Sequence, residues 1–170
     1  MNEPPRWRGC PLRNSFRASE VTHFVRRLTR VFLVVDSTCL ICFEQLGLSA
    51  RLTAAGARLG IVDAVRQEVG LDLDGNAVHG LAGSTVMSRV KADSAVLDER
   101  LGAGEREAIA VCRDDPRWRV FVSDDYQAQR VAEAYGVQTL DTRGLLWTLC
   151  VAGRISYAEF CDGVRKARGK

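Results

Sequence analysis

Two runs of apolar residues, each followed directly by acidic residues, dominate the pattern of this chain. The first is RVFLVVDS at residues 30–37, and the second is RVFVSDD at residues 119–125. Continuous runs of β-branched and aromatic residues are typical of strands that are buried on both faces of a parallel sheet. Open α/β sheets bind their ligands at the carboxyl ends of such strands. We therefore expect Asp36, Asp124 and Asp125 to lie at one acidic pocket.

Helical periodicity fills most of the chain around these two strands. Residues 51–60 fit a further helical turn, and the turn-like residues 71–95 fit one strand. Strands that alternate with helices predict an α/β fold, a three-layer α/β/α sandwich with a central, mainly parallel sheet. The clearest apolar stripes predict helices over residues 38–48, 62–69, 104–115, 126–135, 145–152 and 157–168, and a short strand over 137–140.

The helix that begins at Gly104 carries two glutamates in different positions relative to its apolar stripe. At about 100° per residue, Glu105 falls inside the stripe that runs through Ile109 and Cys112, and Glu107 lies near its edge. An acid on the core side of a helix is costly unless it is paired or bound to a cation. A glutamate in the first turn also complements the helix dipole, so the periodicity leaves two interpretations of Glu105 open.

Positive charge is concentrated at the beginning of the chain. The 170 residues have a formal net charge of +3, but residues 1–30 hold seven arginines and two glutamates, a net of +5, which leaves 3 − 5 = −2 for the rest. A basic arm beside a slightly acidic body is consistent with attraction to phosphate, and a solvated leader has the same composition. We expect a basic N-terminal arm with a short helix at 1–30 and a globular domain at 31–170.

Several other classes of protein fit the pattern less well. No stretch has the roughly 18 apolar residues of a membrane span, and the charged leader has no secretory pattern, so reduced thiols and a cytoplasmic location are expected. Cys39 and Cys42 have the spacing of a redox pair, but the apolar residues between them favour a buried helix. The histidines and other cysteines are too scattered for zinc. A phosphoaspartate site would need a second aspartate close to Asp36.

The predicted topology brings acids from distant parts of the chain to one place. Like charges 4 Å apart repel by about 1–4 kcal/mol per pair at surface-like dielectric, so such a group persists when a cation neutralises it. Oxygen ligands select Mg²⁺ or Mn²⁺, which bind phosphates and activate water for phosphodiester hydrolysis. The acids concerned are Asp36, Glu68, Glu105 and Asp125, with Asp124 and Glu107 beside them.

Three segments of the chain, in this order and spacing, resemble the PIN domain, and in particular the PilT N-terminus-like nucleases that include VapC-type toxins. The first is VVDSTCLICFEQLGL and the second is IVDAVRQEV. The third is LGAGEREAIAVC, followed by a strand that ends in Asp-Asp, a downstream arginine and a Gly-Leu-Leu helix. The similarity spans residues 31–155. It implies a PIN-like α/β/α fold and a metal-dependent endoribonuclease that uses Mg²⁺ or Mn²⁺.

The resemblance also implies roles for individual residues. The catalytic and metal-binding acids would be Asp36, Glu68, Glu105 and Asp125, with Asp124 as a further metal ligand and Glu107 as the substitute for Glu105. Substrate contacts would come from Ser37, Ser123 and Arg130, although an ion pair is equally consistent with Arg130.

The family likeness further implies an RNA substrate and a small antitoxin protein as inhibitor, in a type II toxin–antitoxin pair. A homodimer is a further expectation, with Leu146 and Trp147 as candidates for an exposed apolar surface, although both positions fit a core better. The alternative is a PIN-fold module that binds RNA or a protein and has a weak or silent site.

Overall fold

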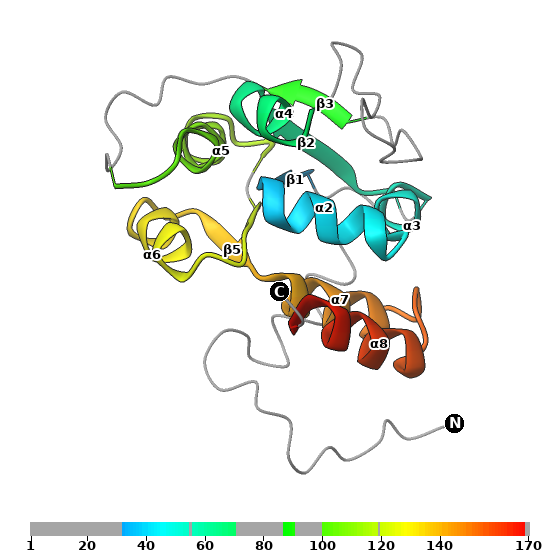
Figure 1. Cartoon of the computed structure of the whole chain (residues 1–170). Coiled ribbons are helices and arrows are strands. Elements are labelled where there is room, and N and C mark those ends of the chain that lie inside the picture. Colours follow the sequence, from blue (N-terminus) through cyan, green and yellow to red (C-terminus); the bar gives the residue numbers. More distant parts are fainter. Residues whose placement is uncertain (1–31, 55, 71–86, 91–99, 119, 169–170) are drawn as a thin grey trace.

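A parallel sheet forms the centre of the molecule (Figure 1). The computed structural model describes residues 32–54, 56–70, 87–90, 100–118 and 120–168. Within them five strands pair in the order β3-β2-β1-β4-β5, and every pair is parallel. The strands are β1 (Phe32–Val35), β2 (Arg58–Val62), β3 (Met87–Val90), β4 (Val120–Val122) and β5 (Gln138–Leu140). The predicted α/β fold with a central parallel sheet is confirmed.

Helices cover the sheet on both faces, with α5 and α6 on one side and α2, α3 and α7 on the other (Figure 1). Right-handed crossovers produce this arrangement when successive strands are added first to one side of β1 and then to the other. The described helices are α2 (Ser37–Gln45), α3 (Leu48–Ala54), α4 (Asp63–Val69), α5 (Ala103–Asp114), α6 (Tyr126–Ala134), α7 (Thr142–Val151) and α8 (Tyr157–Arg168).

The two acidic strands are neighbours in the sheet. Leu33, Val34 and Val35 of β1 pair with Val120, Phe121 and Val122 of β4. All of these side chains are buried, as the continuous apolar runs predicted. The next residue along β1 still follows the ladder, because the Asp36 amide donates to the Val122 carbonyl at 3.1 Å. The acids that follow β1 and β4 therefore lie next to one another at the same edge of the sheet.

The helical turn expected over residues 51–60 is only partly correct. Helix α3 ends at Ala54, and residues 58–62 form β2. The glycine in this strand leaves room for an aromatic ring, since a Cβ at Gly60 would lie 2.5 Å from the Trp118 side chain. Gly60 therefore lies inside a strand, where it makes room for the Trp118 ring. In the sequence alone, this glycine indicated the end of a helical segment. The strand expected within residues 71–95 is β3, and the rest of that segment lies outside the described residues.

Helix α8 is attached to the domain by its capping residues and by aromatic packing. The predicted capping box is present: Glu159 Oε2 accepts from the Ser156 amide at 2.7 Å, and Ser156 Oγ accepts from the Glu159 amide at 3.2 Å. The Ser156 amide and hydroxyl, which both donate to the Glu159 carboxylate, lower the pKa of Glu159 to about 2 together with Arg51 of α3. The ring of Trp147 lies edge-on to Phe160, with centroids 5.4 Å apart.

Leu146 is a core residue, only 1% exposed, so it offers no surface for a dimer. Among the described residues, no helix has both the length and the apolar character needed to cross a bilayer. The basic arm at 1–30 and its short helix lie outside the described residues.

Candidate active site

A cavity of about 520 Å³ opens at the carboxyl ends of β1 and β4. Five of the residues that line it are acids, and they come from four separate parts of the chain. The acids are Asp36, Glu68, Glu105, Asp124 and Asp125, and the other lining residues are Ser37, Thr38, Val65, Gly102 and Gly104.

Asp36 occupies the N-cap of α2, directly after β1. Its Oδ1 accepts from the Cys39 amide at 2.7 Å, and its side chain is hydrogen-bonded to the Ser123 hydroxyl. The residue is only 6% exposed. Burial raises the pKa of Asp36; the Ser123 and Cys39 hydrogen bonds oppose this effect, and the charge of Asp124 adds to it. Asp36 is therefore a rigidly held carboxyl that ionises less readily than a free aspartate.

The two acids after β4 are held by different elements. Asp125 caps α6, since its Oδ1 accepts from the Ala128 amide at 2.8 Å. Asp124 faces the start of α7: its Oδ1 accepts from the Thr142 amide and its Oδ2 from the Thr142 hydroxyl, both at 2.8 Å. Ser123 joins the two strand ends, because its Oγ accepts from the Asp125 amide at 3.1 Å while its hydroxyl bonds to Asp36.

Glu105 lies in the first turn of α5, and both interpretations left open by the periodicity apply to it. Its Oε2 accepts from the amide of the N-cap residue Gly102 at 2.8 Å, so it caps the helix. It also lines the acidic cavity. Burial is the main cause that raises the pKa of Glu105; the Gly102 bond opposes it, and the charges of Asp125, Asp36 and Glu68 raise it further. The carboxylates are therefore close enough to repel one another.

Glu68 reaches the cavity because α4 packs closely against α5. A Cβ on Gly104 would lie 2.9 Å from Val65 Cγ2 and 3.3 Å from Glu68 Oε1, so only glycine permits this approach. Glu107, the substitute candidate, does not line the cavity. Its Oε2 lies 3.3 Å from the Ala64 amide at the start of α4. The geometry therefore favours Glu105 over Glu107 as the cavity acid.

The three predicted substrate-contact residues are found in three different settings. Ser37 lines the acidic cavity. Ser123 is completely buried, and its hydroxyl group contacts Asp36 and the Asp125 amide. In the structure it therefore positions acids, whereas the sequence predicted a contact with substrate. Arg130 lines a separate pocket along α6. The sequence analysis did not identify Thr142, because hydrophobic periodicity gives no information about what a hydroxyl contacts. The one indication in the sequence was that Thr142 follows Asp141, a residue type that often caps the start of a helix.

The cysteines near the site have no redox geometry. Cys39 and Cys42 are both buried, and no disulfide joins them. Burial, with the charges of Asp36 and Asp124, raises the pKa of the Cys39 thiol well above its usual range. A redox-active cysteine needs an accessible thiolate. Cys39 instead belongs to the hydrogen-bonded support of the acids, since Thr142 Oγ1 lies 3.2 Å from its sulfur.

The donor set of the cavity fits a hard divalent cation. No lysine, arginine or histidine is among the described residues that line it. Glu105 Oε1, Asp125 Oδ2 and both carboxylate oxygens of Glu68 have no hydrogen-bond donor in the described part of the chain. Oxygen-only ligation suits Mg²⁺ or Mn²⁺. In the same described residues, no three His, Cys, Asp or Glu side chains form a tight metal-ligand group.

Comparisons with known proteins agree with this geometry. A family model described as PIN domain matches residues 32–162, which include the whole cavity. Comparisons with curated proteins and with solved structures found no significant match. PIN domains are generally nucleases and typically use divalent metal ions. With its β3-β2-β1-β4-β5 sheet, its acids at the carboxyl ends of β1 and β4 and this match over most of its length, the chain belongs to the PIN-domain family.

Proposed function

We propose that this PIN domain is an endoribonuclease that hydrolyses RNA phosphodiester bonds with the help of Mg²⁺ or Mn²⁺. One observation carries the proposal: five carboxylates line a single cavity whose described lining contains no basic side chain. Such a charge distribution is unfavourable by itself and becomes favourable when a divalent cation and a phosphate occupy the site.

Each acid has a distinct part in this proposal. Glu68, Glu105 and Asp125 would hold the cation through the oxygens that lack donors, and Asp36 would complete the set from the floor of the cavity. A bound Mg²⁺ or Mn²⁺ supplies an activated water and offsets the charge that develops on the phosphate. Asp124 is a further ligand candidate whose orientation is set by Thr142.

The remaining polar residues of the cavity position these acids or the substrate. Ser123 keeps Asp36 and Asp125 in register at the ends of their strands. Ser37, partly exposed beside Asp36, offers a hydroxyl to a phosphate oxygen. The burial of Asp36 keeps bulk water away from the inner side of the site, where electrostatic interactions are consequently stronger.

Cleavage assays with paired variants test the nuclease proposal. Asp36→Asn and Asp125→Asn each remove one charge while keeping a side chain that caps α2 or α6, so both should fold. We expect cleavage of labelled RNA by the native protein with Mg²⁺ or Mn²⁺, none with a chelator, and a loss of at least about 100-fold, roughly 2.7 kcal/mol of transition-state stabilisation, in each variant.

Asp162→Asn is the matched control, since Asp162 is a half-exposed acid of α8 that pairs with Lys166. Equal cleavage by all variants would reject the site. Tight RNA binding without metal-dependent cleavage would instead support the silent RNA-binding module.

The biological role that we propose is the toxin of a type II toxin–antitoxin pair of the VapC type. A cavity lined by five acids would accept a basic side chain from a small inhibitor, which would displace the cation. Expression of the native chain should arrest growth, and Asp36→Asn should not. Growth arrest that Asp36→Asn also causes would contradict a toxin that acts through this site.

A further inference from the structure

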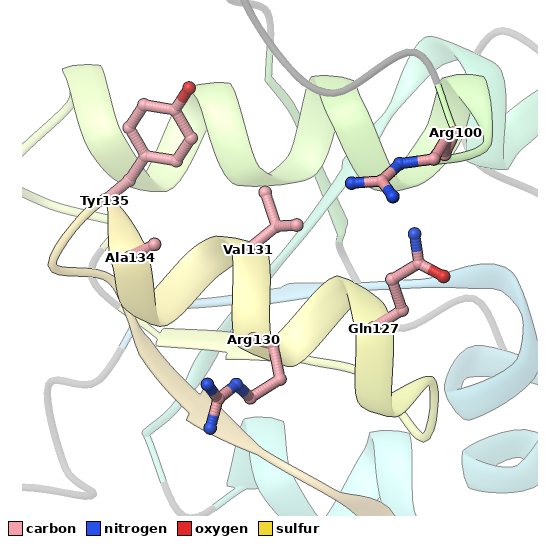
Figure 2. Close-up of a pocket in the computed structure, with 6 residues that line it drawn as sticks. All are labelled: Arg100, Gln127, Arg130, Val131, Ala134 and Tyr135. Atoms are coloured by element: carbon pink, nitrogen blue, oxygen red, sulfur yellow. The ribbon is translucent and has the colours of Figure 1, made fainter.

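A second pocket, of about 550 Å³, runs along α6 (Figure 2). Four of its residues recur on α6 at positions i, i+3, i+4 and i+7, so they form one stripe of that helix. We call this pocket the α6 groove. Its lining residues are Arg100, Gln127, Arg130, Val131, Ala134 and Tyr135.

The α6 groove adjoins the acidic cavity on two walls. On one wall, Gly102 lines the cavity and Arg100 lines the groove. On the other, Asp125 lines the cavity and Gln127 lines the groove. Two residues of chain span at most about 7 Å. The two hollows therefore approach one another to within about 7 Å on both walls, so a strand held in the cavity can reach the groove.

The described side chains that line the groove carry positive charge, whereas those that line the cavity carry negative charge. Arg100 and Arg130 are exposed, and no acid is among the described residues that line the groove. Figure 2 shows the side chains of Arg100 and Gln127 pointing toward one another at the end nearest the start of α6. At the other end stands Tyr135, 42% exposed, with the Arg113 guanidinium 5.7 Å from its ring centroid.

Two arginines, an amide, an apolar floor and a partly exposed aromatic ring match the chemistry of a single nucleic-acid strand. Guanidinium groups bind phosphates, and aromatic rings stack on unpaired bases. From Gln127 to Tyr135 the helix rises by about 12 Å, since each residue adds about 1.5 Å. A base-paired strand could not offer its bases to the ring, so the groove suits single-stranded RNA.

We propose that the α6 groove binds the single-stranded RNA that extends from the cleaved phosphodiester, with phosphates at Arg100 and Arg130 and a base against Tyr135. This inference relies on the proposed function for the position of the cut. Binding in the groove, however, is measurable without any cleavage, so the two proposals can fail separately.

Fluorescence anisotropy with a short labelled single-stranded RNA tests the groove, in chelator so that no metal-dependent cleavage occurs. The test variant is Arg100→Ala with Arg130→Ala. The control is Arg154→Ala with Arg165→Ala, which removes two charges from exposed positions near the start of α8 and on α8 itself. We expect Kd to rise about tenfold in the test variant and to stay unchanged in the control.

The salt dependence identifies the lost contacts as phosphate contacts. For single strands, the slope of log Kd against log salt should fall by about 1.4 when two phosphate contacts are lost. Tyr135→Ala should also weaken binding, whereas Tyr135→Phe should retain it because the ring remains. With metal present, the Arg100 and Arg130 variant should show a raised KM and a nearly unchanged kcat.

Three results would overturn the inference. The first is an unchanged Kd and salt slope in the Arg100 and Arg130 variant. The second is equal binding of a duplex of the same length. The third is unchanged RNA binding together with a changed mass in solution, which would assign the groove to a protein partner or a second copy. Loss of RNA binding in this variant, with no metal-dependent cleavage by the native protein, would retain the groove and reject the nuclease.

Discussion

Thr142 shows how much of the site depends on side chains that touch no substrate. Its amide and hydroxyl hold both oxygens of Asp124, and its hydroxyl also lies beside the Cys39 sulfur. Cys39 in turn contacts Asp36. A hydrogen-bonded chain thus runs from the start of α7 to the acid after β1, and it joins the acids of the two central strands from behind.

Thr142→Val tests this link, because valine has nearly the same shape and lacks the hydroxyl. We expect a loss of about 1.5–3 kcal/mol in the free energy of unfolding, the usual range for a hydrogen bond to a charged group such as the Asp124 carboxylate. Cleavage should fall as well, because Asp124 would keep only the amide bond. Thr142→Ser retains the hydroxyl and should restore both properties; if it behaves like Thr142→Val in urea unfolding and in cleavage, the hydroxyl is not the cause.

The raised pKa of Asp36 predicts that the stability of the metal-free protein depends on pH in an unusual direction. Its pKa is raised in the folded state, mainly by burial. The folded protein therefore binds more protons than the unfolded chain between the usual value of 3.8 and the raised one, and stability falls as pH rises through this window. Above the raised pKa, Asp36 is ionised in the folded protein, and the burial of its charge lowers the free energy of unfolding by the full amount.

Asp36→Asn removes that charge and keeps the N-cap. In chelator near pH 7, we expect the variant to melt at a higher temperature than the native protein. The difference should shrink as pH falls through the raised pKa toward 3.8. A melting temperature that is lower in the variant at neutral pH would show that the Asp36 carboxylate stabilises the fold without a cation.

At the scale of elements, the close packing of α4 on α5 decides which acids meet. Gly104 lies in the first turn of α5, against Val65 and Glu68 of α4. This contact carries Glu68 to the cavity and directs Glu107 to the start of α4. The short helix α4 thus supplies Glu68 to the site because it packs closely against α5.

Gly104→Ala should separate the two helices. In an open helix position alanine is more stable than glycine by about 0.5–1 kcal/mol, but here the new methyl group meets Val65 Cγ2 at 2.9 Å. Overpacking of this kind costs about 1–3 kcal/mol. Urea unfolding should therefore show destabilisation, and cleavage should decline as Glu68 moves away.

Val65→Ala provides the matched partner for a double-mutant cycle. It removes the methyl group that the new side chain meets, so the double variant should be more stable than the sum of the single effects predicts. Additive effects of Gly104→Ala and Val65→Ala would mean that the helices do not meet at these two residues.

At the scale of the whole molecule, the strand order creates the site. The sheet continues from β1 to β2 and β3 on one side, and to β4 and β5 on the other. The chain therefore turns away in opposite directions after β1 and after β4, which leaves a crevice at their carboxyl ends. The acidic cavity lies at this crevice, and the α6 groove lies along the helix that follows β4.

Binding of a divalent ion in the crevice should stabilise the whole domain. At a concentration 100 times its Kd, a ligand specific to the folded state contributes about 2.7 kcal/mol, and each kcal/mol raises the melting temperature by about 2–4 °C for a domain of this size. We expect this shift with Mg²⁺ or Mn²⁺ by calorimetry, and its loss in Asp125→Asn. An equal shift in native and variant proteins would place the ion elsewhere.

The sequence by itself determined the features that depend on neighbouring residues. Apolar runs predicted β1 and β4, periodicity predicted α4, α5 and α6 to within a few residues, and the Ser156–Glu159 spacing predicted the cap of α8. These features arise from local hydrogen bonding and from the alternation of buried and exposed positions. Strands that end in acids were therefore sufficient to predict an acidic crevice in an α/β fold.

Only the tertiary structure decided the features that depend on distant packing. Trp118 makes Gly60 part of a strand, and the contact at Gly104 favours Glu105 over Glu107. The direction of α6 places Arg130 in the basic groove, outside the acidic cavity. These outcomes depend on which side chains far apart in the sequence meet, and periodicity contains no information about that, because it records only which face of an element is buried.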